Sequence, residues 1–324
     1  MSFSIVFHGS NAAVFADGFS NLLDAPHTIA ILPDTLTDPA DIQTFQQADV
    51  IIGISYHASL PPVKNLKLYH VPGAGYDGID LSALPGTSHL CNCYGHEQPI
   101  AEYVMAAILN RAIPMTHADE QLRQGQWTYW AGGSGIKHQE IAGLTIGLLG
   151  FGHIGKAIAK RAKAFEMTVL VANRSPVAAS PMVDQSFSLS ALNQFWAHAD
   201  IVVCSLPLSE DTKGLVNQHA FAHMKKSAVI LNVGRGPVID ETALYDALHS
   251  KKIAGAIIDT WYQYPSQQNP NPLPGQKPFH MLSNIIITPH MSGWTSGTIK
   301  RRQKTIADNI NQLLRSAPLV NQIR

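Results

Sequence analysis

The chain lacks the features that mark several protein classes. Three cysteines in 324 residues are too few for a disulfide framework. Its 23 Lys and Arg offset 23 Asp and Glu, so we expect no nucleic-acid partner. No apolar run reaches about eighteen residues, so we expect no membrane partner. The opening stretch MSFSIVFHGS predicts a β-strand and not a secretory signal, which favours a cytoplasmic protein.

The cysteines raise the question of a metal site. Cys91 and Cys93 lie close to His96, but no second pair of soft ligands follows at the spacing of zinc motifs. Cys204 stands inside the apolar run DIVVCSL. Because buried cysteine usually behaves as a small hydrophobic residue, we predict core positions for all three and no bound metal.

The chain does have enough apolar residues for two cores, at 45% of its composition. Four candidate strands precede residue 95, and six more begin at residue 144, with helix-sized intervals between them. This alternation is typical of parallel sheets covered on both faces. A long buried helix is predicted over residues 100–111 and an amphipathic helix over 295–316, whereas the proline-rich stretch 264–278 predicts a loop. We predict an α/β protein with two doubly wound sheets.

A glycine motif opens the second series. Gly150, Gly152 and Gly155 directly follow the apolar run LTIGLL and begin a helix. In this context the first glycine permits a tight turn, the second lets the backbone approach a pyrophosphate, and the third allows helix and strand to pack closely. The helix N-terminus offers N–H groups to the anion. The motif predicts a dinucleotide cofactor.

The tip of the next strand indicates which dinucleotide. About 20 residues past the motif, NAD-binding proteins carry a carboxylate that accepts a hydrogen bond from the ribose 2′-hydroxyl. Asn173 stands there, followed by Arg174 and Ser175. An amide does not repel a 2′-phosphate, and a guanidinium can pair with one. We therefore expect NADP(H) to be preferred, with NAD(H) possible.

Further segments resemble the D-2-hydroxyacid dehydrogenase superfamily, which includes glyoxylate/hydroxypyruvate reductases. The resemblance rests on VPGAGYDGIDL (71–81), IAEYVMAAIL (100–109), GLTIGLLGFGHIG (143–155), ADIVVCSLPLSEDTKGLVN (199–217), LNVGRGPVIDETAL (231–244) and ITPHMSGWT (287–295). It implies a Rossmann cofactor domain, residues 99–289, inserted into a flavodoxin-like substrate domain, residues 1–98 and 290–324. It also implies a homodimer that reduces a small 2-keto acid to a D-2-hydroxy acid.

The same resemblance assigns roles to single residues. Arg235 matches the arginine that holds the substrate, and His290 matches the histidine that gives the proton. The substrate carboxylate is expected on the backbone of Ala74 and Gly75, and the pocket wall is expected to include Tyr76, His96 and Trp294. Cofactor contacts are expected at the residues already named and at His153, Ile154, Leu206, Pro207, Thr212, Val233, Gly234, Asp259, His290, Ser292 and Gly293.

One position departs from the family. The glutamate that pairs with the catalytic histidine is replaced by Tyr264, or by Gln263 if the alignment slips by one residue. A phenol can orient the imidazole but adds no charge, so we expect keto acid reduction to decline at a less alkaline pH than in glutamate-bearing members.

A formate dehydrogenase-like enzyme and a cofactor-sensing regulatory protein are the alternative functions.

Overall fold

A computed structural model describes residues 2–266 and 268–324. The chain divides into two compact units: the first combines the residues up to His96 with Trp294–Arg324, and the second is Glu97–Gly293. The sequence-based division puts residues 97–98 and 290–293 in the first domain, whereas the structure puts them in the second unit. Backbone amides of residues 291 and 292 donate to the buried Asp259, which ties this segment to the second unit.

The first unit is built on a parallel five-stranded sheet. Its strand order is β2-β1-β3-β4-β5, which is the flavodoxin-like order expected from the family. The elements are β1 (Ser4–His8), α1 (Ser10–Ala13), η1 (Phe19–Leu22), β2 (Thr28–Leu32), α2 (Pro39–Gln46), β3 (Val50–Ile52), β4 (Leu68–His70), β5 (His89–Cys91) and α9 (Ser296–Leu314).

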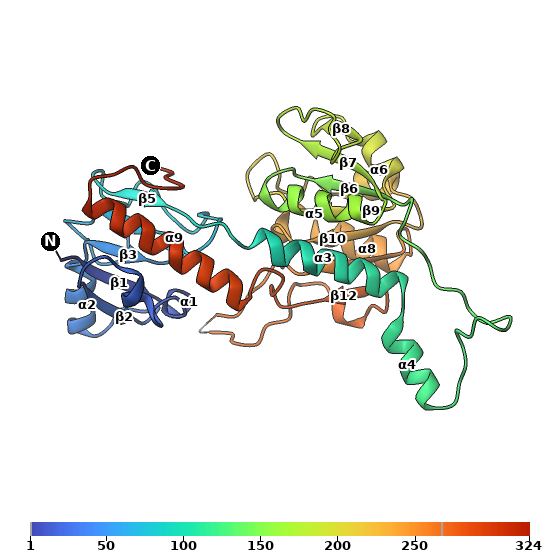
Figure 1. The fold of residues 1–324 in the computed structure, drawn as a ribbon, viewed down its shortest axis with the longest axis horizontal. Helices are drawn as coiled ribbons and strands as arrows, with labels where there is room; N and C mark the ends of the chain where they lie inside the picture. The colour runs from blue at the N-terminus through green and yellow to red at the C-terminus, as the bar shows by residue number, and fades with distance from the viewer. Residues whose placement is uncertain (1, 267) are drawn as a thin grey trace. The chain divides into compact units, whose positions relative to one another are not determined.

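Helix α9 completes the core of this unit from the far end of the chain (Figure 1). Its buried Ile306 and Ile310 belong to the same apolar cluster as Phe7, Cys91 and Cys93. Burial raises the pKa of both thiols to about 12, so they remain protonated. The three cysteines are free and buried, as core positions require.

A buried histidine links the sheet to α9. His70 Nε2 accepts a hydrogen bond from Asn309 Nδ2 at 2.9 Å, and its Nδ1 donates to the carbonyl of Val71 at 3.2 Å. Asn309 also accepts from the amide of Val320 at 2.7 Å, which fixes the orientation of its own amide. Burial lowers the pKa of His70 to about 4, so the ring is neutral in the folded protein.

This arrangement predicts a loss of stability in mild acid. The unfolded chain takes up a proton on His70 near its ordinary pKa of 6.5, whereas the folded protein does so only near 4. Stability from the neutral ring is therefore complete above about pH 6.5 and falls by about 3 kcal/mol as the pH drops to 4. We expect His70→Gln to lower Tm at pH 7 but to flatten its fall between pH 7 and 5. Equal falls in Tm for both proteins would contradict this. The variant should still lose some stability as the pH falls, because burial also lowers the pKa values of His8 and His27.

The second unit is built on a parallel seven-stranded sheet in the order β12-β11-β10-β9-β6-β7-β8, the Rossmann arrangement with an added strand. The elements are α3 (Glu97–Ala112), α4 (Met115–Arg123), β6 (Thr145–Leu149), α5 (His153–Ala164), β7 (Thr168–Asn173), β8 (Gln185–Ser188), α6 (Asn193–His198), β9 (Ile201–Cys204), α7 (Gln218–His223), β10 (Val229–Asn232), η2 (Gly236–Val238), α8 (Glu241–His249), β11 (Gly255–Ile258), η3 (Phe279–Met281) and β12 (Ile285–Ile287).

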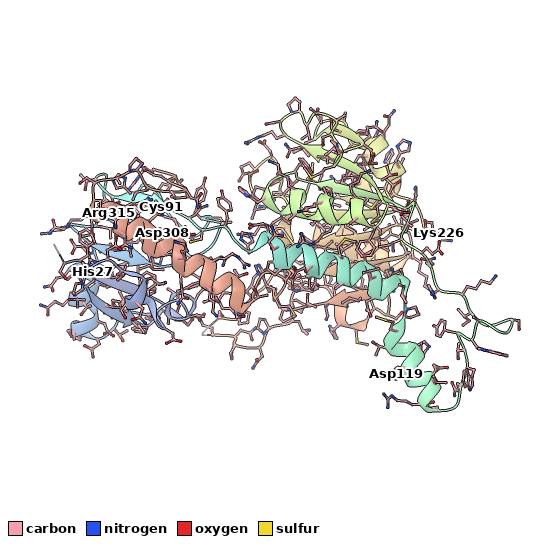
Figure 2. The ribbon with its side chains drawn as sticks, viewed as in Figure 1. His27, Cys91, Asp119, Lys226, Asp308 and Arg315 are labelled. Atoms are coloured by element: carbon pink, nitrogen blue, oxygen red, sulfur yellow. The ribbon has the colours of Figure 1, made fainter. Side chains whose placement is uncertain are left out.

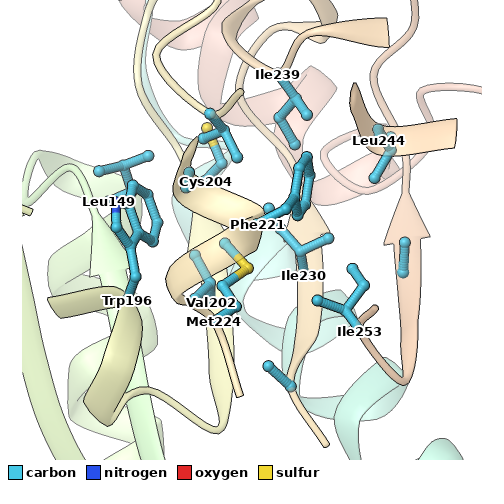
Figure 3. Packing of buried hydrophobic residues seen from close by; sticks show 14 of the residues in the cluster. Leu149, Trp196, Val202, Cys204, Phe221, Met224, Ile230, Ile239, Leu244 and Ile253 are labelled. Atoms are coloured by element: carbon cyan, nitrogen blue, oxygen red, sulfur yellow. The ribbon is translucent and has the colours of Figure 1, made fainter. Parts of the chain in front are cut away.

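Apolar side chains fill both faces of this sheet. On one face Trp196, Phe221 and Met224 pack over Val202 and Ile230 (Figure 3). On the other face α3 and α5 pack together over a second cluster, with Ile158 fully buried. Central strands such as Ile201–Cys204 are buried along their whole length, which explains their continuous apolar sequences. The two-sheet α/β fold is thus confirmed.

One segment of the second unit stands away from the sheet. It comprises α4, marked by Asp119 in Figure 2, and residues 124–140, most of which are exposed. We call this segment the arm. Its apolar side chains are half or more exposed at Met115, Leu122, Trp127, Trp130 and Ile136. Such a concentration of exposed apolar area usually marks an interaction surface.

Two features are absent from the described residues. No helix there combines the length and the apolar character needed to cross a bilayer. Within the same part of the chain, no group of three or more His, Cys, Asp or Glu side chains is placed to hold a metal ion.

Candidate active site

The candidate residues of the second unit gather at one edge of its sheet. Gly150 follows β6, Asn173 ends β7, Leu206 follows β9, Arg235 follows β10, and His290 follows β12. Because the strands are parallel, all these positions lie at the carboxyl edge. In doubly wound proteins ligands bind at this edge.

The glycine turn has the backbone that a pyrophosphate site requires. Gly150 has φ 103°, which disfavours any side chain, and a Cβ on Gly155 would collide with the carbonyl of Gly150. A Cβ on Gly152 would meet no described atom within 4 Å, so the backbone at the start of α5 faces open space. No described side chain caps that helix start, where His153 and Ile154 follow. These residues fit a dinucleotide phosphate.

The tip of β7 is held against this turn. Asn173 Oδ1 accepts a hydrogen bond from the amide of Phe151 at 3.4 Å, and its Nδ2 donates to the carbonyl of Ser175 at 3.0 Å. Arg174 and Ser175 are exposed, and no carboxylate in the described chain pairs with Arg174. Asn173 therefore orders the turn, while Arg174 remains available to an anion.

Two further loops complete this edge. In the loop after β9, the Thr212 hydroxyl donates to the carbonyl of Pro207 at 2.7 Å and so closes a turn. In the loop after β10, a Cβ on Gly234 would lie 2.6 Å from the carbonyl oxygen of Leu206, which requires glycine there. Val233 is buried beneath this contact. The two loops thus pack backbone to backbone.

Arg235 lies in a turn that its neighbours fix. The side chain of Asn232 donates to the carbonyl of Arg235 at 3.0 Å and accepts from the amide of Gly234 at 3.1 Å. A Cβ on Gly236 would collide with the carbonyl of Trp261, so the turn sits directly against the loop after β11. The Arg235 side chain is half buried, and its Nη1 donates to the carbonyl of Gly234 at 3.1 Å. The side chain of Asn232 therefore holds this turn in addition to the guanidinium.

The structure brings Tyr264 and His290 together. Tyr264 Oη lies 2.9 Å from His290 Nδ1, and it accepts a hydrogen bond from the amide of Trp261 at 3.0 Å. The amide fixes the phenol oxygen, which can accept a proton from the charged imidazole or donate one to the neutral ring. The backbone N–H of Gln263 donates to the carbonyl of Pro274. Tyr264 is thus the neighbour of the histidine.

The buried carboxylate of Asp259 holds the backbone that follows His290. His290 has φ 57°, a left-handed conformation that is uncommon outside glycine. Asp259 is fully buried and accepts hydrogen bonds from the amides of Met291 at 2.9 Å and Ser292 at 3.0 Å. Its carboxylate therefore faces the loop 288–292. Gly293 follows as the last residue of the unit.

The remaining candidates belong to the first unit. The carbonyl of Ala74 accepts a hydrogen bond from Asn92 Nδ2 at 2.7 Å, which orders the loop that Gly75 continues. Tyr76 is 41% exposed, and His96 is buried. Trp294 is 46% exposed and packs edge-on against Phe15, 6.2 Å between ring centroids. Trp294 therefore combines a packing role with an exposed face.

Sequence reasoning missed three residues that organise this site. Trp261 donates its amide to Tyr264 and its indole N–H to the carbonyl of Thr288 at 2.7 Å. The Thr288 hydroxyl bonds both Asp259 and Tyr103. Tyr103 is a polar group between the buried Ala101 and Val104 of α3, and that position was the one available signal. Its partners, 185 residues away, could not be inferred.

Known protein sequences resemble most of the chain. Residues 105–292 match the family described as D-isomer specific 2-hydroxyacid dehydrogenase, NAD binding domain. A glyoxylate/hydroxypyruvate reductase B of Enterobacter sp. (strain 638) is 32% identical over 86% of this chain and 84% of its own. A D-3-phosphoglycerate dehydrogenase of Archaeoglobus fulgidus is 30% identical over 80% of this chain and 47% of its own.

Solved structures resemble the whole chain as well. A D-isomer specific 2-hydroxyacid dehydrogenase family protein of Aeromonas salmonicida is 27% identical, with a TM-score of 0.81 over 99% of this chain and 98% of its own. A D-isomer specific 2-hydroxyacid dehydrogenase of Xanthobacter autotrophicus Py2, solved with NADPH and MES, is 27% identical, with a TM-score of 0.80 over 100% of this chain and 98% of its own. The similarity therefore extends over both units.

Proposed function

The chain belongs to the D-isomer specific 2-hydroxyacid dehydrogenase family, and we propose that it reduces a small 2-keto acid to the D-2-hydroxy acid. The observation that carries this proposal is the gathering of Arg235, His290 and the glycine turn at the carboxyl edge of one parallel sheet. Relatives named glyoxylate/hydroxypyruvate reductase support a small substrate. The second unit binds the cofactor and the first binds the substrate.

His290 supplies the proton. When bound, the reduced nicotinamide supplies the hydride. The keto oxygen then gains negative charge, and protonated His290 gives it the proton on Nε2. Tyr264 Oη has two lone pairs, so it accepts both the Trp261 amide proton and the ring's Nδ1 proton. Tyr264 thus orients the ring without adding a charge.

Charged and backbone groups position the substrate. The guanidinium of Arg235 binds the keto oxygen and the carboxylate with its planar set of donors. The backbone N–H groups of Ala74 and Gly75 receive the carboxylate, and Tyr76, His96 and Trp294 form the pocket wall. These roles follow from the family resemblance and from the placement of each residue in its own unit.

The cofactor is NADP(H) in preference to NAD(H). The related structure from Xanthobacter autotrophicus was solved with NADPH, which supports this choice. Exposed Arg174 pairs with the 2′-phosphate, and Ser175 adds a hydroxyl donor.

Removing the Arg174 side chain is expected to weaken NADPH binding selectively. A charged hydrogen bond to phosphate contributes about 1.5–3 kcal/mol, so Arg174→Ala should raise Kd for NADPH about 10- to 150-fold. Kd for NADH should change by less than about threefold, because NADH has no 2′-phosphate. Fluorescence titration of both cofactors on both proteins measures this. Equal affinities in the wild type would refute the preference.

The arm supports a homodimer. Its exposed Trp127 and Trp130 need a partner surface. A pocket of about 510 Å³ lies at the base of the arm, and its lining combines apolar residues such as Ile108 and Ile201 with the charged Arg111, Glu140 and Asp200. A second copy of the chain can cover both, and sedimentation velocity tests this.

We place the enzyme in the cytoplasm, where its three free cysteines stay reduced.

A substrate panel tests the proposed reaction. Glyoxylate, hydroxypyruvate, pyruvate and larger 2-keto acids would be offered with NADPH or NADH, and formate with the oxidised cofactors, while cofactor absorbance is followed. We expect the highest kcat/KM with a small 2-keto acid. Turnover of formate alone would establish a formate dehydrogenase instead. Tight NADPH binding without any turnover would establish a cofactor-sensing protein.

A further inference from the structure

A line of hydroxyl groups runs from α3 to the loop of His290. Tyr103, half buried on α3, places its hydroxyl 2.7 Å from Thr288 Oγ1, which lies 2.6 Å from Asp259 Oδ1. An ionised carboxylate only accepts hydrogen bonds, so the Thr288 proton goes to Asp259. Tyr103 must then donate to Thr288. The direction of the line is fixed: Tyr103 to Thr288 to Asp259.

The far end of this line holds the backbone at His290. Asp259 also accepts the amides of Met291 and Ser292. Successive N–H groups beside a left-handed residue form a concave site for an anion, and here the anion is Asp259. A left-handed non-glycine residue costs about 1–2 kcal/mol, and the hydrogen bonds to Asp259 offset this cost at His290, where φ is 57°.

Burial strengthens each bond in this line. Asp259 is fully buried, and burial is the main cause that raises the pKa of Tyr103, with the charge of Asp259 adding to it. The phenol therefore remains a proton donor at neutral pH. A buried carboxylate that loses one of its donors becomes less well satisfied and holds its other partners less firmly.

We propose that Tyr103 is a positioning residue for His290, acting through Thr288 and Asp259. Its hydroxyl donates to Thr288, which keeps the Thr288 proton directed at Asp259, and Asp259 in turn fixes the backbone from which the imidazole projects. Tyr264 orients the imidazole ring separately. Tyr103 thus fixes the position of the His290 backbone, and Tyr264 fixes the orientation of its ring. The catalytic consequence rests on the proposed function of His290.

Kinetics test the catalytic consequence. One buried hydrogen bond contributes about 0.5–1.5 kcal/mol, so Tyr103→Phe should lower kcat about two- to tenfold with Kd for NADPH unchanged. Thr288→Val should lower kcat further, and Thr288→Ser should restore it. Adding Tyr103→Phe to Thr288→Val should have no further effect, because the line is already broken. Tyr245→Phe on α8 is the matched control and should match the wild type.

Amide hydrogen exchange tests the line without any turnover. In NMR, Tyr103→Phe should speed exchange at Met291 and Ser292 about two- to tenfold, whereas Tyr245→Phe should not. Unchanged exchange and unchanged kcat in Tyr103→Phe would overturn the proposal while leaving the reaction established by wild-type turnover. If the wild type reduces no 2-keto acid, the proposed function fails, and exchange alone then decides whether Tyr103 holds this loop.

Discussion

Replacing His290 by Asn is expected to lower kcat for 2-keto acid reduction by about 10²- to 10⁴-fold, the usual contribution of a positioned acid. Asn tolerates the left-handed conformation that His290 adopts. The loop is held by the amides of Met291 and Ser292, which the substitution leaves in place. Kd for NADPH should therefore stay within about twofold, and stopped-flow reduction measures the rate. A kcat within about threefold of the wild type would exclude His290 as the proton donor.

Variants at Tyr264 separate the proton from its orientation. Tyr264→Phe keeps the ring packing but removes the hydroxyl at 2.9 Å from His290 Nδ1, so kcat should fall only about tenfold. Tyr264→Glu places a carboxylate beside the imidazolium and favours its charged form. The alkaline limb of kcat/KM should then move to higher pH. Coincident pH profiles for the wild type and both variants would show that Tyr264 does not act on His290.

Replacing Arg235 by Gln should be the second large loss. Leaving a buried substrate carboxylate without its charged partner costs about 2–5 kcal/mol, so kcat/KM for the keto acid should fall about 30- to 4000-fold. The loss should appear in KM as well as kcat, because the role we propose for the guanidinium is to bind both the carboxylate and the keto oxygen. Steady-state kinetics at saturating NADPH measure it.

The controls for Arg235 follow from its surroundings. Its turn is held by the side chain of Asn232, so Arg235→Gln should leave Tm within a few degrees of the wild type. Arg235→Lys should recover only part of the loss, because an ammonium lacks the planar pair of donors. Arg174→Ala is the comparison variant, measured at saturating NADPH. If it lowered kcat/KM for the keto acid as strongly as Arg235→Gln does, the loss would not be evidence that Arg235 binds the substrate.

Much of the fold could be predicted because its signals are local. Continuous apolar runs between helix-sized intervals identified four strands of the first sheet and six of the second. Two strands were missed. β5 has the sequence HLC, whose two apolar residues stand between polar neighbours. β8 has the sequence QSFS, which lacks apolar character because it is an edge strand with little burial.

The site could be predicted only as far as motifs reach. The glycine turn and the pairing of Tyr264 with His290 follow from spacing along the chain and from the family. The roles of Thr288 and Tyr103 depend on contacts between distant residues, which no periodicity records. The cofactor contact at Asp259 was expected from its side chain or from the neighbouring backbone, and its carboxylate bonds the loop 288–292. The contacts that support a site are thus the part of it that is hardest to predict from the sequence.

The discontinuous first unit sets an order of events during synthesis. All of the second unit, Glu97–Gly293, leaves the ribosome before α9, and this unit has its own core. The first unit must wait with an incomplete core until Ile306 and Ile310 arrive. Domains generally fold as units, so the middle of this chain can fold first while its N-terminal quarter remains open. Until α9 is synthesised, the N-terminal part of the first unit exposes the most apolar surface that chaperones could bind.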